Sequence, residues 1–534
     1  MEEKKIAAQI DAGDVALGIE LGSTRIKAVL VTPSSETIAA GSYGWENERR
    51  DGIWTYALSK VWEGLAACYL DLSQNVMERY GVKLHKIRAM GISAMMHGYL
   101  PFDKDGIQIV PFRTWRNTTT GQAAAHLTEA FHFNIPQRWS VAHLDQALLN
   151  GEAHVRDIAY LTTLAGYVHW RLTGEKVLGI GDASGMFPIE EATGTYDAAK
   201  LAVFETLPEV QGMPWKLGDI LPRVLRAGEP AGTLSAEGAR LLDPSGALEP
   251  GAVFAPPEGD AGTGMVSTNA VRKRTGNISI GTSAFSMHVL DAPLREVHRD
   301  IDIVTTPEGA PVAMVHTNNC SSEINAWAGL FQEVARCLGK EVPMDALYAA
   351  LFRATESADL DAGGLVTYNC LSGEPILDVE EGRPLFLRTP HGSMHLANFM
   401  LAQLYAAFAP LRIGLDILTQ QEKIAVDSLV AQGGLFRTPR IAQQILANEL
   451  GLPITVRKTA SEGGAWGMAV LAVYTWKGGK TGLADFLDQN VFGDVAAETC
   501  DPVPDGMRGA EQFLARYKKA LSVERAASVL SEDA

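Results

Sequence analysis

Short apolar runs separated by glycine-containing turns alternate with helical patterns along most of the chain. Residues 15–20 (VALGIE) and 26–32 are two such runs, and the tight turn between them predicts a β-hairpin. Residues 54–80 have the apolar spacing of a helix, and residues 87–93 form another buried-strand candidate that ends at a turn. Mixed strands and helices continue as far as Asp260, so this half of the chain is predicted to be an α/β domain.

The same pattern starts again after a stretch rich in proline and glycine, LEPGAVFAPPEGDAGTG. Residues 277–280 and 284–289 are predicted strands on either side of a Gly-Thr-Ser turn, as in the first hairpin. This echo indicates a duplicated core. Helical patterns follow at 396–418, 441–450 and from 506 to the end.

Length and composition indicate a soluble protein with two domains. A chain of 534 residues is too long for one ordinary hydrophobic core. The net charge of −17 argues against a general surface for nucleic acid or anionic membranes, because both require basic patches. One phosphorylated ligand is still allowed, since backbone N–H groups can hold a small anion.

Cysteine usage and the absence of targeting patterns predict a cytoplasmic protein. The five cysteines form no CxxC pair, which favours a reducing compartment over a disulfide scaffold or a zinc site. The first residues, MEEKKIAAQIDAGD, are charged and lack the apolar stretch of a signal peptide. Uninterrupted apolar runs long enough for a membrane span do not occur in the sequence.

The turn formed by Gly22, Ser23 and Thr24 is the first candidate phosphate site. Glycine lets the backbone approach an anion, the hydroxyls add donors, and Lys27 could add positive charge. Glu20, at the end of the preceding strand, could hold Mg²⁺ directly or through water, because magnesium prefers oxygen ligands. An ordinary hairpin turn with a solvated lysine is the alternative interpretation.

Gly281, Thr282 and Ser283 repeat this chemistry in the second half, again with a plain turn as the alternative. A nucleotide triphosphate clamped between two domains needs donors from both sides. The sequence contains no GxxxxGK[ST], so a P-loop fold is not supported. Gly433 and Gly434, between a predicted strand and helix, could let the backbone lie flat against an adenine or ribose, although glycine pairs are common at such junctions.

Asp260 is the candidate catalytic acid–base residue. It lies in PPEGDAGTG, which is too rich in glycine for a helix interior and follows an apolar stretch. A carboxylate placed there can accept a proton from an attacking hydroxyl, as the catalytic aspartate does in kinases. The alternative is a helix N-cap, a position at which aspartate is among the preferred residues.

A candidate sugar site follows the strand that ends near residue 93. His97 could hydrogen-bond a sugar hydroxyl, with Met96 as an apolar wall and Gly98 leaving room. Further along, Trp115 offers an aromatic platform and Asn117 an amide, a combination suited to a polyol. Histidines at such places are often structural, and tryptophans more often belong to a core.

Taken in order, these segments resemble the FGGY family of carbohydrate kinases over residues 15–472. GIELGSTRIKA is similar to the family's first phosphate motif, GTSAF to the second and AQGGLFRTP to the adenosine motif. GISAMMHG, TWRN, RLTGE with GDASGM, and EGDAGTGM also follow the family's order. The resemblance implies an α/β fold with two ribonuclease-H-like domains of the actin/hexokinase type. It also implies an active-site cleft between them that closes around a sugar and MgATP.

The resemblance also implies a domain layout and an assignment of roles. The N-terminal domain would cover 14–268, the C-terminal domain 269–496 and a helical tail 497–534. Asp260 matches the catalytic base and, with Glu20, would hold Mg²⁺. ATP would be bound by the two phosphate turns, Lys27 and the Gly433–Gly434 pair.

The substrate is predicted from one tripeptide. Met96, His97 and Gly98 match the xylulokinase branch of the family, which favours phosphorylation of a pentulose such as xylulose. A kinase for another ketose or polyol (ribulose, erythritol) and a non-catalytic sugar- and nucleotide-binding sensor are the alternatives. Two departures from the family motifs motivate the sensor: Glu20 replaces an aspartate, and Leu435 replaces a third glycine. Dimers are common in the family, so a homodimer is also considered.

Overall fold

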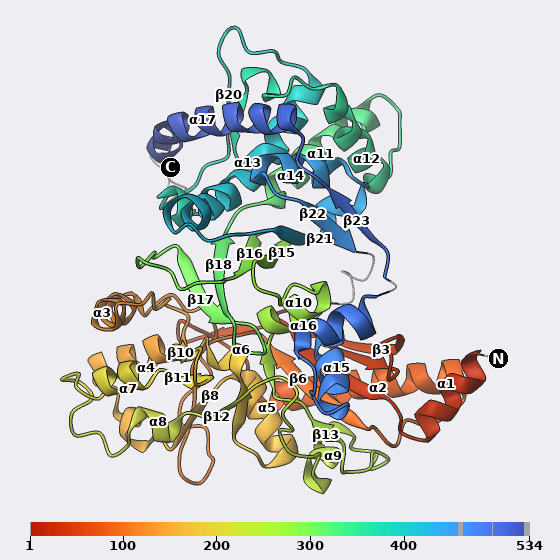
Figure 1. Ribbon diagram of the computed structural model, residues 1–534, viewed down its shortest axis with the longest axis vertical. Helices are drawn as coiled ribbons and strands as arrows, with labels where there is room; N and C mark the ends of the chain where they lie inside the picture. The colour runs from red at the N-terminus through yellow and green to blue at the C-terminus, as the bar shows by residue number, and fades with distance from the viewer. Residues whose placement is uncertain (1, 458–462, 494, 528–534) are drawn as a thin grey trace. The chain divides into compact units, whose positions relative to one another are not determined.

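The computed structural model describes residues 2–457, 463–493 and 495–527, which form two compact units (Figure 1). Among these residues, the first unit contains 2–271, 302–312 and 463–493. The second unit contains 272–301, 313–457 and 495–527. Both units therefore combine segments that lie far apart in the sequence.

The first unit is built on a mixed sheet. Its strands run in the order β13-β6-β1-β2-β3, with bounds Val253–Phe254, Ala89–Ala94, Ala16–Leu21, Arg25–Val31 and Thr37–Gly44. β1, β2 and β3 are antiparallel neighbours, whereas β6 pairs in parallel with β1 and with β13. The predicted hairpin of residues 15–32 is confirmed as β1 and β2, and the predicted strand 87–93 is confirmed as β6.

The second unit repeats this arrangement. Its sheet runs β18-β16-β15-β21-β22-β23, with bounds Pro311–Thr317, Ala284–Val289, Thr275–Ile280, Ser428–Gly433, Ile454–Arg457 and Ala497–Cys500. β17 (Ile301–Thr305) belongs to the first unit from Asp302 onward. β15 and β16 form an antiparallel hairpin, while β21 pairs in parallel with β15 and β22. β1, β2, β6 and β13 thus correspond to β15, β16, β21 and β22. The duplicated core predicted from the two hairpins is confirmed.

Helices cover the first sheet through close backbone contacts. α2 (Leu58–Tyr80) packs on β2 and β3, and α15 (Gly463–Trp476) packs on β1 and β6. Figure 1 shows α15 beside β6. A Cβ added at Gly18 of β1 would lie only 2.0 Å from the carbonyl oxygen of Ala465. Only glycine at this position allows α15 to lie so close to the sheet.

The other elements of the first unit surround this core. Its helices are α1 (Glu2–Asp11), α3 (Gly121–Phe131), α4 (Ser140–Leu149), α5 (Leu164–Thr173), α6 (Ile180–Ala183), α7 (Ala198–Phe204), α8 (Leu217–Ile220), α9 (Ala236–Leu242), α10 (Asp260–Thr268) and α16 (Leu483–Phe486). Its short strands are β4 (Glu48–Arg50), β5 (Ile53–Thr55), β7 (Leu100–Phe102), β8 (Tyr160–Thr162), β9 (Val177–Gly179), β10 (Ile189–Glu190), β11 (Thr195–Tyr196), β12 (Arg223–Leu225) and β14 (Glu258–Gly259).

The prediction of a helix from residue 54 is wrong at its start. Residues 53–55 form β5, which pairs antiparallel with β4, and the helix begins only at Leu58. The backbone N–H and carbonyl of Trp54 are both hydrogen-bonded by the side-chain amide of Asn117, 63 residues away. A long-range contact therefore fixes an extended conformation that local spacing could not reveal.

The core of the second unit is formed by α13 (Leu396–Asp416), α14 (Ile441–Leu450) and α17 (Pro504–Ala526), with α11 (Ser321–Cys337), α12 (Met344–Ala354), β19 (Val366–Tyr368) and β20 (Leu385–Leu387) around them. α13 continues into a π-helical turn and confirms the helix predicted at 396–418. Leu396–Gln421 is, among the described helices, the one long and apolar enough to span a membrane. Within its most apolar stretch 78% of the residues are buried, as in the core helix of a globular unit.

α17 closes the second unit on the outside of α14. Phe513 and Tyr517 are fully buried in the core, and the Tyr368 hydroxyl donates a 2.5 Å hydrogen bond to the Tyr517 carbonyl. The described part of the predicted tail, 497–527, therefore packs within this unit, while 528–534 lie outside the described residues. The predicted domains 14–268 and 269–496 are contiguous, whereas each compact unit combines separate segments of the chain. The domain boundaries stay a prediction.

Candidate active site

The turn between β1 and β2 is held from one side by two aromatic donors. The Trp45 indole N–H donates to the Gly22 carbonyl at 2.7 Å, and the Tyr56 hydroxyl donates to the Ser23 carbonyl at 2.6 Å. The two rings stack with centroids 4.3 Å apart. Thr24 completes the turn and is exposed. Trp45 and Tyr56 fix the turn's conformation, but neither lies in a motif that sequence reasoning could single out.

Glu20 and Lys27 face each other across the β1–β2 ladder beside this turn. Burial raises the pKa of Glu20, while the Lys27 charge and the Ala465 N–H lower it. A Cβ added at Gly464 would lie 2.4 Å from Glu20 Oε1 and 2.8 Å from Thr263 Oγ1, so glycine makes room for the carboxylate. A half-buried carboxylate next to an ammonium group suits a site for Mg²⁺ and phosphate.

Asp260 is the first residue of α10, where the helix dipole favours a negative charge. Its Oδ1 accepts hydrogen bonds from the N–H groups of Ala261 at 3.0 Å and Met96 at 3.4 Å. The N-cap position is taken by Gly259, so the alternative that Asp260 serves as the N-cap is wrong. Desolvation by the surrounding protein and the charge of Glu20 raise the pKa of Asp260 to about 6, although the side chain reaches solvent.

His97 lies next to Met96 in a left-handed conformation (φ 69°) and is 5% exposed. Burial lowers the pKa of His97 to about 3, so the imidazole is neutral at physiological pH. Its Nδ1 lies 3.2 Å from the Gly185 carbonyl, which can only accept, so Nδ1 carries the proton and Nε2 is an acceptor. The ring stacks on Trp139, and Gly98 (φ 90°) turns the chain away. This arrangement presents a fixed acceptor suited to a hydroxyl.

Of the two other residues predicted to contact the sugar, Asn117 is buried and Trp115 is exposed. Asn117 is 4% exposed, and its amide hydrogen-bonds the backbone of Trp54 and the Thr114 carbonyl. These bonds use its Oδ1 and Nδ2 to hold β5. The Trp115 side chain is 40% exposed and available to a ligand. The sugar-contact role of both residues stays a prediction, with Trp115 the better placed.

Two further acids, Asp182 and Glu258, are buried near Asp260. They lie in the GDASGM and EGDAGTGM motifs, but sequence reasoning gave neither of them a role. Asp182 of α6 is completely buried, and its Oδ2 accepts a 2.6 Å hydrogen bond from Thr163 Oγ1. Burial, reinforced by Asp260, raises the pKa of Asp182 to about 7. Glu258 is buried beside it, accepts the Asp182 N–H, and has a pKa raised by burial to about 8. At neutral pH, Asp260 is therefore the most strongly ionised of these three acids.

In the second unit, the turn of Gly281, Thr282 and Ser283 leads directly to a helix N-terminus. The Ser321 N–H and hydroxyl donate to the Gly281 carbonyl, and the Cys320 N–H donates to the Thr282 carbonyl. Ser321 is the first residue of α11. A glycine-containing turn beside a helix N-terminus is a suitable arrangement for binding phosphate.

Gly433 and Gly434 follow β21, as predicted. Gly433 has φ 129°, and a Cβ there would lie 2.0 Å from the Ile280 carbonyl oxygen, so close strand packing requires glycine. A Cβ at Gly434 would meet no neighbour within 4 Å, which leaves that backbone open to a ligand. Leu435 is 5% exposed and belongs to the core of the second unit. The departure from a third glycine therefore affects core packing.

Each unit thus carries a hairpin turn suited to phosphate on the same sheet topology, and the first unit adds a carboxylate of raised pKa at the N-terminus of α10. These features define a phosphotransferase of the actin/hexokinase-like class. The chain belongs to the FGGY family of carbohydrate kinases: the family's N-terminal domain matches residues 15–243 and its C-terminal domain residues 276–476. The protein is accordingly an ATP-dependent sugar kinase.

Individual relatives agree with this class. A xylulose kinase from Klebsiella pneumoniae is 23% identical over 476 residues, which cover 85% of this chain and 89% of that protein. The crystal structure of xylulose kinase from Rhodospirillum rubrum matches with a TM-score of 0.77 at 19% identity, covering 95% of this chain and 98% of the other. That of gluconate kinase from Lactobacillus acidophilus gives 0.75 at 16% identity, covering 96% and 98%.

Proposed function

We propose that the enzyme phosphorylates a hydroxyl of a five-carbon ketose, with xylulose as the first candidate. The observation that carries this proposal is the neutral His97, whose Nε2 is left as an acceptor for a hydroxyl. His97 follows Met96, whose N–H donates to Asp260. The relative from Klebsiella pneumoniae, similar over most of both chains, is named a xylulose kinase. The fold alone does not select the sugar, because a gluconate kinase is nearly as similar in structure as a xylulose kinase.

In the proposed reaction, a sugar hydroxyl oxygen bonds to the γ-phosphorus of ATP as the bond to the β,γ-bridging oxygen breaks, releasing ADP. Asp260 takes the proton of the attacking hydroxyl. Its Oδ1 accepts the Ala261 and Met96 N–H groups, which leaves Oδ2 as the oxygen that receives the proton. Most of the rate enhancement would come from positioning and from N–H donors aimed at the transferred charge.

Mg²⁺ is the proposed metal cofactor, and the residues present fit it. Glu20 and Asp260 offer carboxylate oxygens, the ligands that magnesium prefers. The Glu20 charge helps burial to raise the pKa of Asp260, and a cation beside the two carboxylates would offset that repulsion. When bound, the ion would neutralise charge on the phosphate oxygens. Lys27 would add positive charge beside the turn of Gly22, Ser23 and Thr24.

The remaining predictions about activity, assembly and location have less support from the structure. A binding protein without transfer activity has little support, because Leu435 lies in the core and Glu20 keeps a carboxylate beside Lys27. The active-site cleft between domains, the homodimer and the cytoplasmic location also stay predictions. The free state of all five cysteines agrees with a reducing compartment.

The substrate is tested by ADP release with MgATP against D-xylulose, L-xylulose, D- and L-ribulose, erythritol, glycerol and gluconate. We expect kcat/KM for one pentulose to exceed that for gluconate and glycerol by at least about 100-fold, because hydrogen bonds to correctly placed hydroxyls discriminate strongly. Higher activity on gluconate or glycerol would contradict the pentulose assignment. ATP binding without ADP release on any sugar would favour the sensor.

The pH dependence of the reaction follows from the raised pKa of Asp260. The carboxylate must be deprotonated to accept the hydroxyl proton, so kcat/KM for the sugar should fall about tenfold per pH unit below about pH 6. Enzyme incubated at pH 5 and assayed after return to pH 7.5 controls for unfolding. A flat profile between pH 5 and 8 would show that another group accepts the proton.

A further inference from the structure

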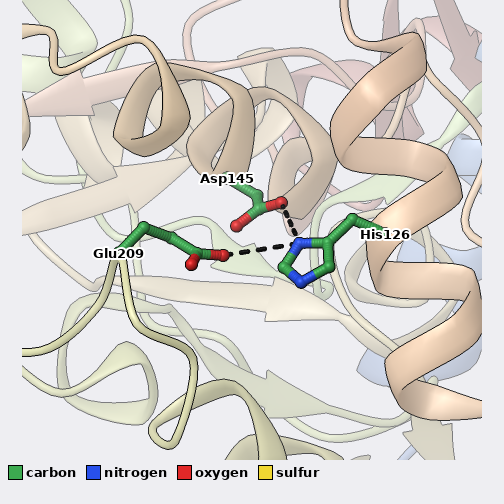
Figure 2. A group of neighbouring side chains, drawn as sticks. All are labelled: His126, Asp145 and Glu209. Carbon is green, nitrogen blue, oxygen red and sulfur yellow. Dashed lines mark hydrogen bonds and ion pairs between the residues drawn. The ribbon is translucent and has the colours of Figure 1, made fainter.

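Three side chains of the first unit that have no part in the proposed reaction converge on one point. His126 comes from α3, Asp145 from α4, and Glu209 from the loop after α7, and Figure 2 shows all three pointing toward one another. His126 Nδ1 lies 3.2 Å from Asp145 Oδ2 and 3.4 Å from Glu209 Oε1. One potential ligand atom from each residue lies within 4.8 Å of the others.

Two carboxylate oxygens of the cluster lack a hydrogen-bond partner in the described part of the chain. The Asp145 side chain is completely buried, and its Oδ1 has no hydrogen-bond partner in the described part of the chain. Glu209 is 11% exposed, and its buried Oε1 likewise accepts no hydrogen bond there. Both carboxyl groups approach the same imidazole nitrogen, His126 Nδ1, in a largely buried place. Buried carboxylates of this kind are normally paired with a cation or bound to a metal.

We propose that His126, Asp145 and Glu209 bind a divalent transition-metal ion of the zinc type. One imidazole nitrogen and two carboxylate oxygens form a ligand set that Zn²⁺ accepts, with bonds of about 2.0–2.2 Å. Ligand atoms on a tetrahedron of that size lie about 3.4 Å apart. The two distances from His126 Nδ1 to the carboxylate oxygens, 3.2 and 3.4 Å, already match that spacing. The His126 side chain is 35% exposed, which gives a metal ion access and leaves room for a water as fourth ligand.

The position of the cluster indicates a structural role. The metal would join α3, α4 and the loop after α7, three segments separated along the chain. α4 begins at Ser140, whose hydroxyl donates a 2.6 Å hydrogen bond to the Gly98 carbonyl, and Trp139 just before it stacks on His97. The ion would therefore fix the helix whose first turn supports the His97 motif, without contacting the sugar.

Metal binding is tested on the full chain after treatment with chelator, without nucleotide or sugar. Titration with CoCl₂ should produce visible absorption bands that saturate at one Co²⁺ per chain. Addition of ZnCl₂ should displace the Co²⁺ and remove these bands. We expect a Kd on the order of micromolar or tighter and a rise in Tm of about 2–5 °C at saturating Zn²⁺. His126→Ala and Asp145→Asn should each weaken binding by at least about tenfold, because each removes one of three protein ligands.

Two kinds of control separate this site from others. Glu129→Gln removes an exposed carboxylate from α3, and we expect it to bind Co²⁺ and Zn²⁺ as the unmodified protein does. Glu20→Gln should also keep this binding, which distinguishes the cluster from the proposed magnesium site.

The alternative is that the cluster is an ion pair between a protonated His126 and the two acids, with no metal. Absence of stoichiometric Co²⁺ and Zn²⁺ binding to the folded protein would overturn the proposal in favour of that ion pair. Binding that is unchanged in both His126→Ala and Asp145→Asn would also overturn it. Because the measurement is binding without substrate, its result is independent of the proposed sugar.

Discussion

Replacing Asp260 with asparagine is expected to lower kcat by about 10²–10⁴-fold while changing the Kd of the sugar only a few-fold. Asparagine keeps the shape of the side chain, and its Oδ1 can still accept the Ala261 and Met96 N–H groups. It cannot take up the proton of the attacking hydroxyl. The loss should therefore appear in turnover, measured by ADP release, while sugar binding is measured by calorimetry.

A matched variant shows whether the loss is specific. Asp219→Asn removes an exposed carboxylate from the short helix α8 of the same unit and should leave kcat within about twofold, as usual for surface positions. In Asp260→Asn the fall in rate below pH 6 should also disappear, because the titrating group is gone. A variant with kcat near that of the unmodified enzyme would rule out Asp260 as the base.

The parts of the fold that the sequence predicts are those fixed by neighbouring residues. Both hairpins, β1–β2 and β15–β16, are local structures in which apolar strands flank a short glycine-containing turn. The helices α2, α13, α14 and α17 were also predicted, since their apolar spacing persists over several turns, whereas α11 was not. The error at residues 53–55 has the opposite origin, because Asn117 imposes the strand from a distant part of the chain.

The residues of the candidate site also fall into two groups: those in local motifs, and those that only the fold brings together. Asp260, His97 and the two phosphate turns lie in short motifs that occur in the order of a known family, so they could be predicted. Asp182 and Glu258 acquire their raised pKa values only when the fold buries them, and the sequence shows neither that burial nor the proximity of Asp182 to the other two acids. The cluster of His126, Asp145 and Glu209 comes from three separate segments and has no ligand spacing that a motif would capture.

The second large effect is expected at Glu20, which replaces the aspartate of the family's first phosphate motif. Glu20→Gln is expected to lower kcat/KM for MgATP by about 10²-fold and to raise the Mg²⁺ concentration required for half-maximal rate. Glutamine has nearly the same size and can still accept the Ala465 N–H, but it removes the negative charge beside Lys27. The Kd of the sugar should stay within a few-fold, because the proposed sugar contacts are at Met96 and His97. Initial rates over a matrix of Mg²⁺ and ATP concentrations measure both effects.

The same variant also tests whether Glu20 and Asp260 act as one electrostatic unit. The Glu20 charge contributes to the raised pKa of Asp260, so its removal should lower that pKa and move the acid limb of kcat/KM for the sugar to lower pH. Glu20→Asp keeps the charge on a shorter arm and should recover most of the MgATP kinetics. Glu36→Gln, an exposed position after β2, should change neither property. Unaltered MgATP kinetics together with an unmoved acid limb in Glu20→Gln would mean that the metal is held elsewhere. Loss of activity in Glu20→Asp as well would mean that the longer glutamate arm is itself required, because this chain places its carboxylate in the space left open by Gly464.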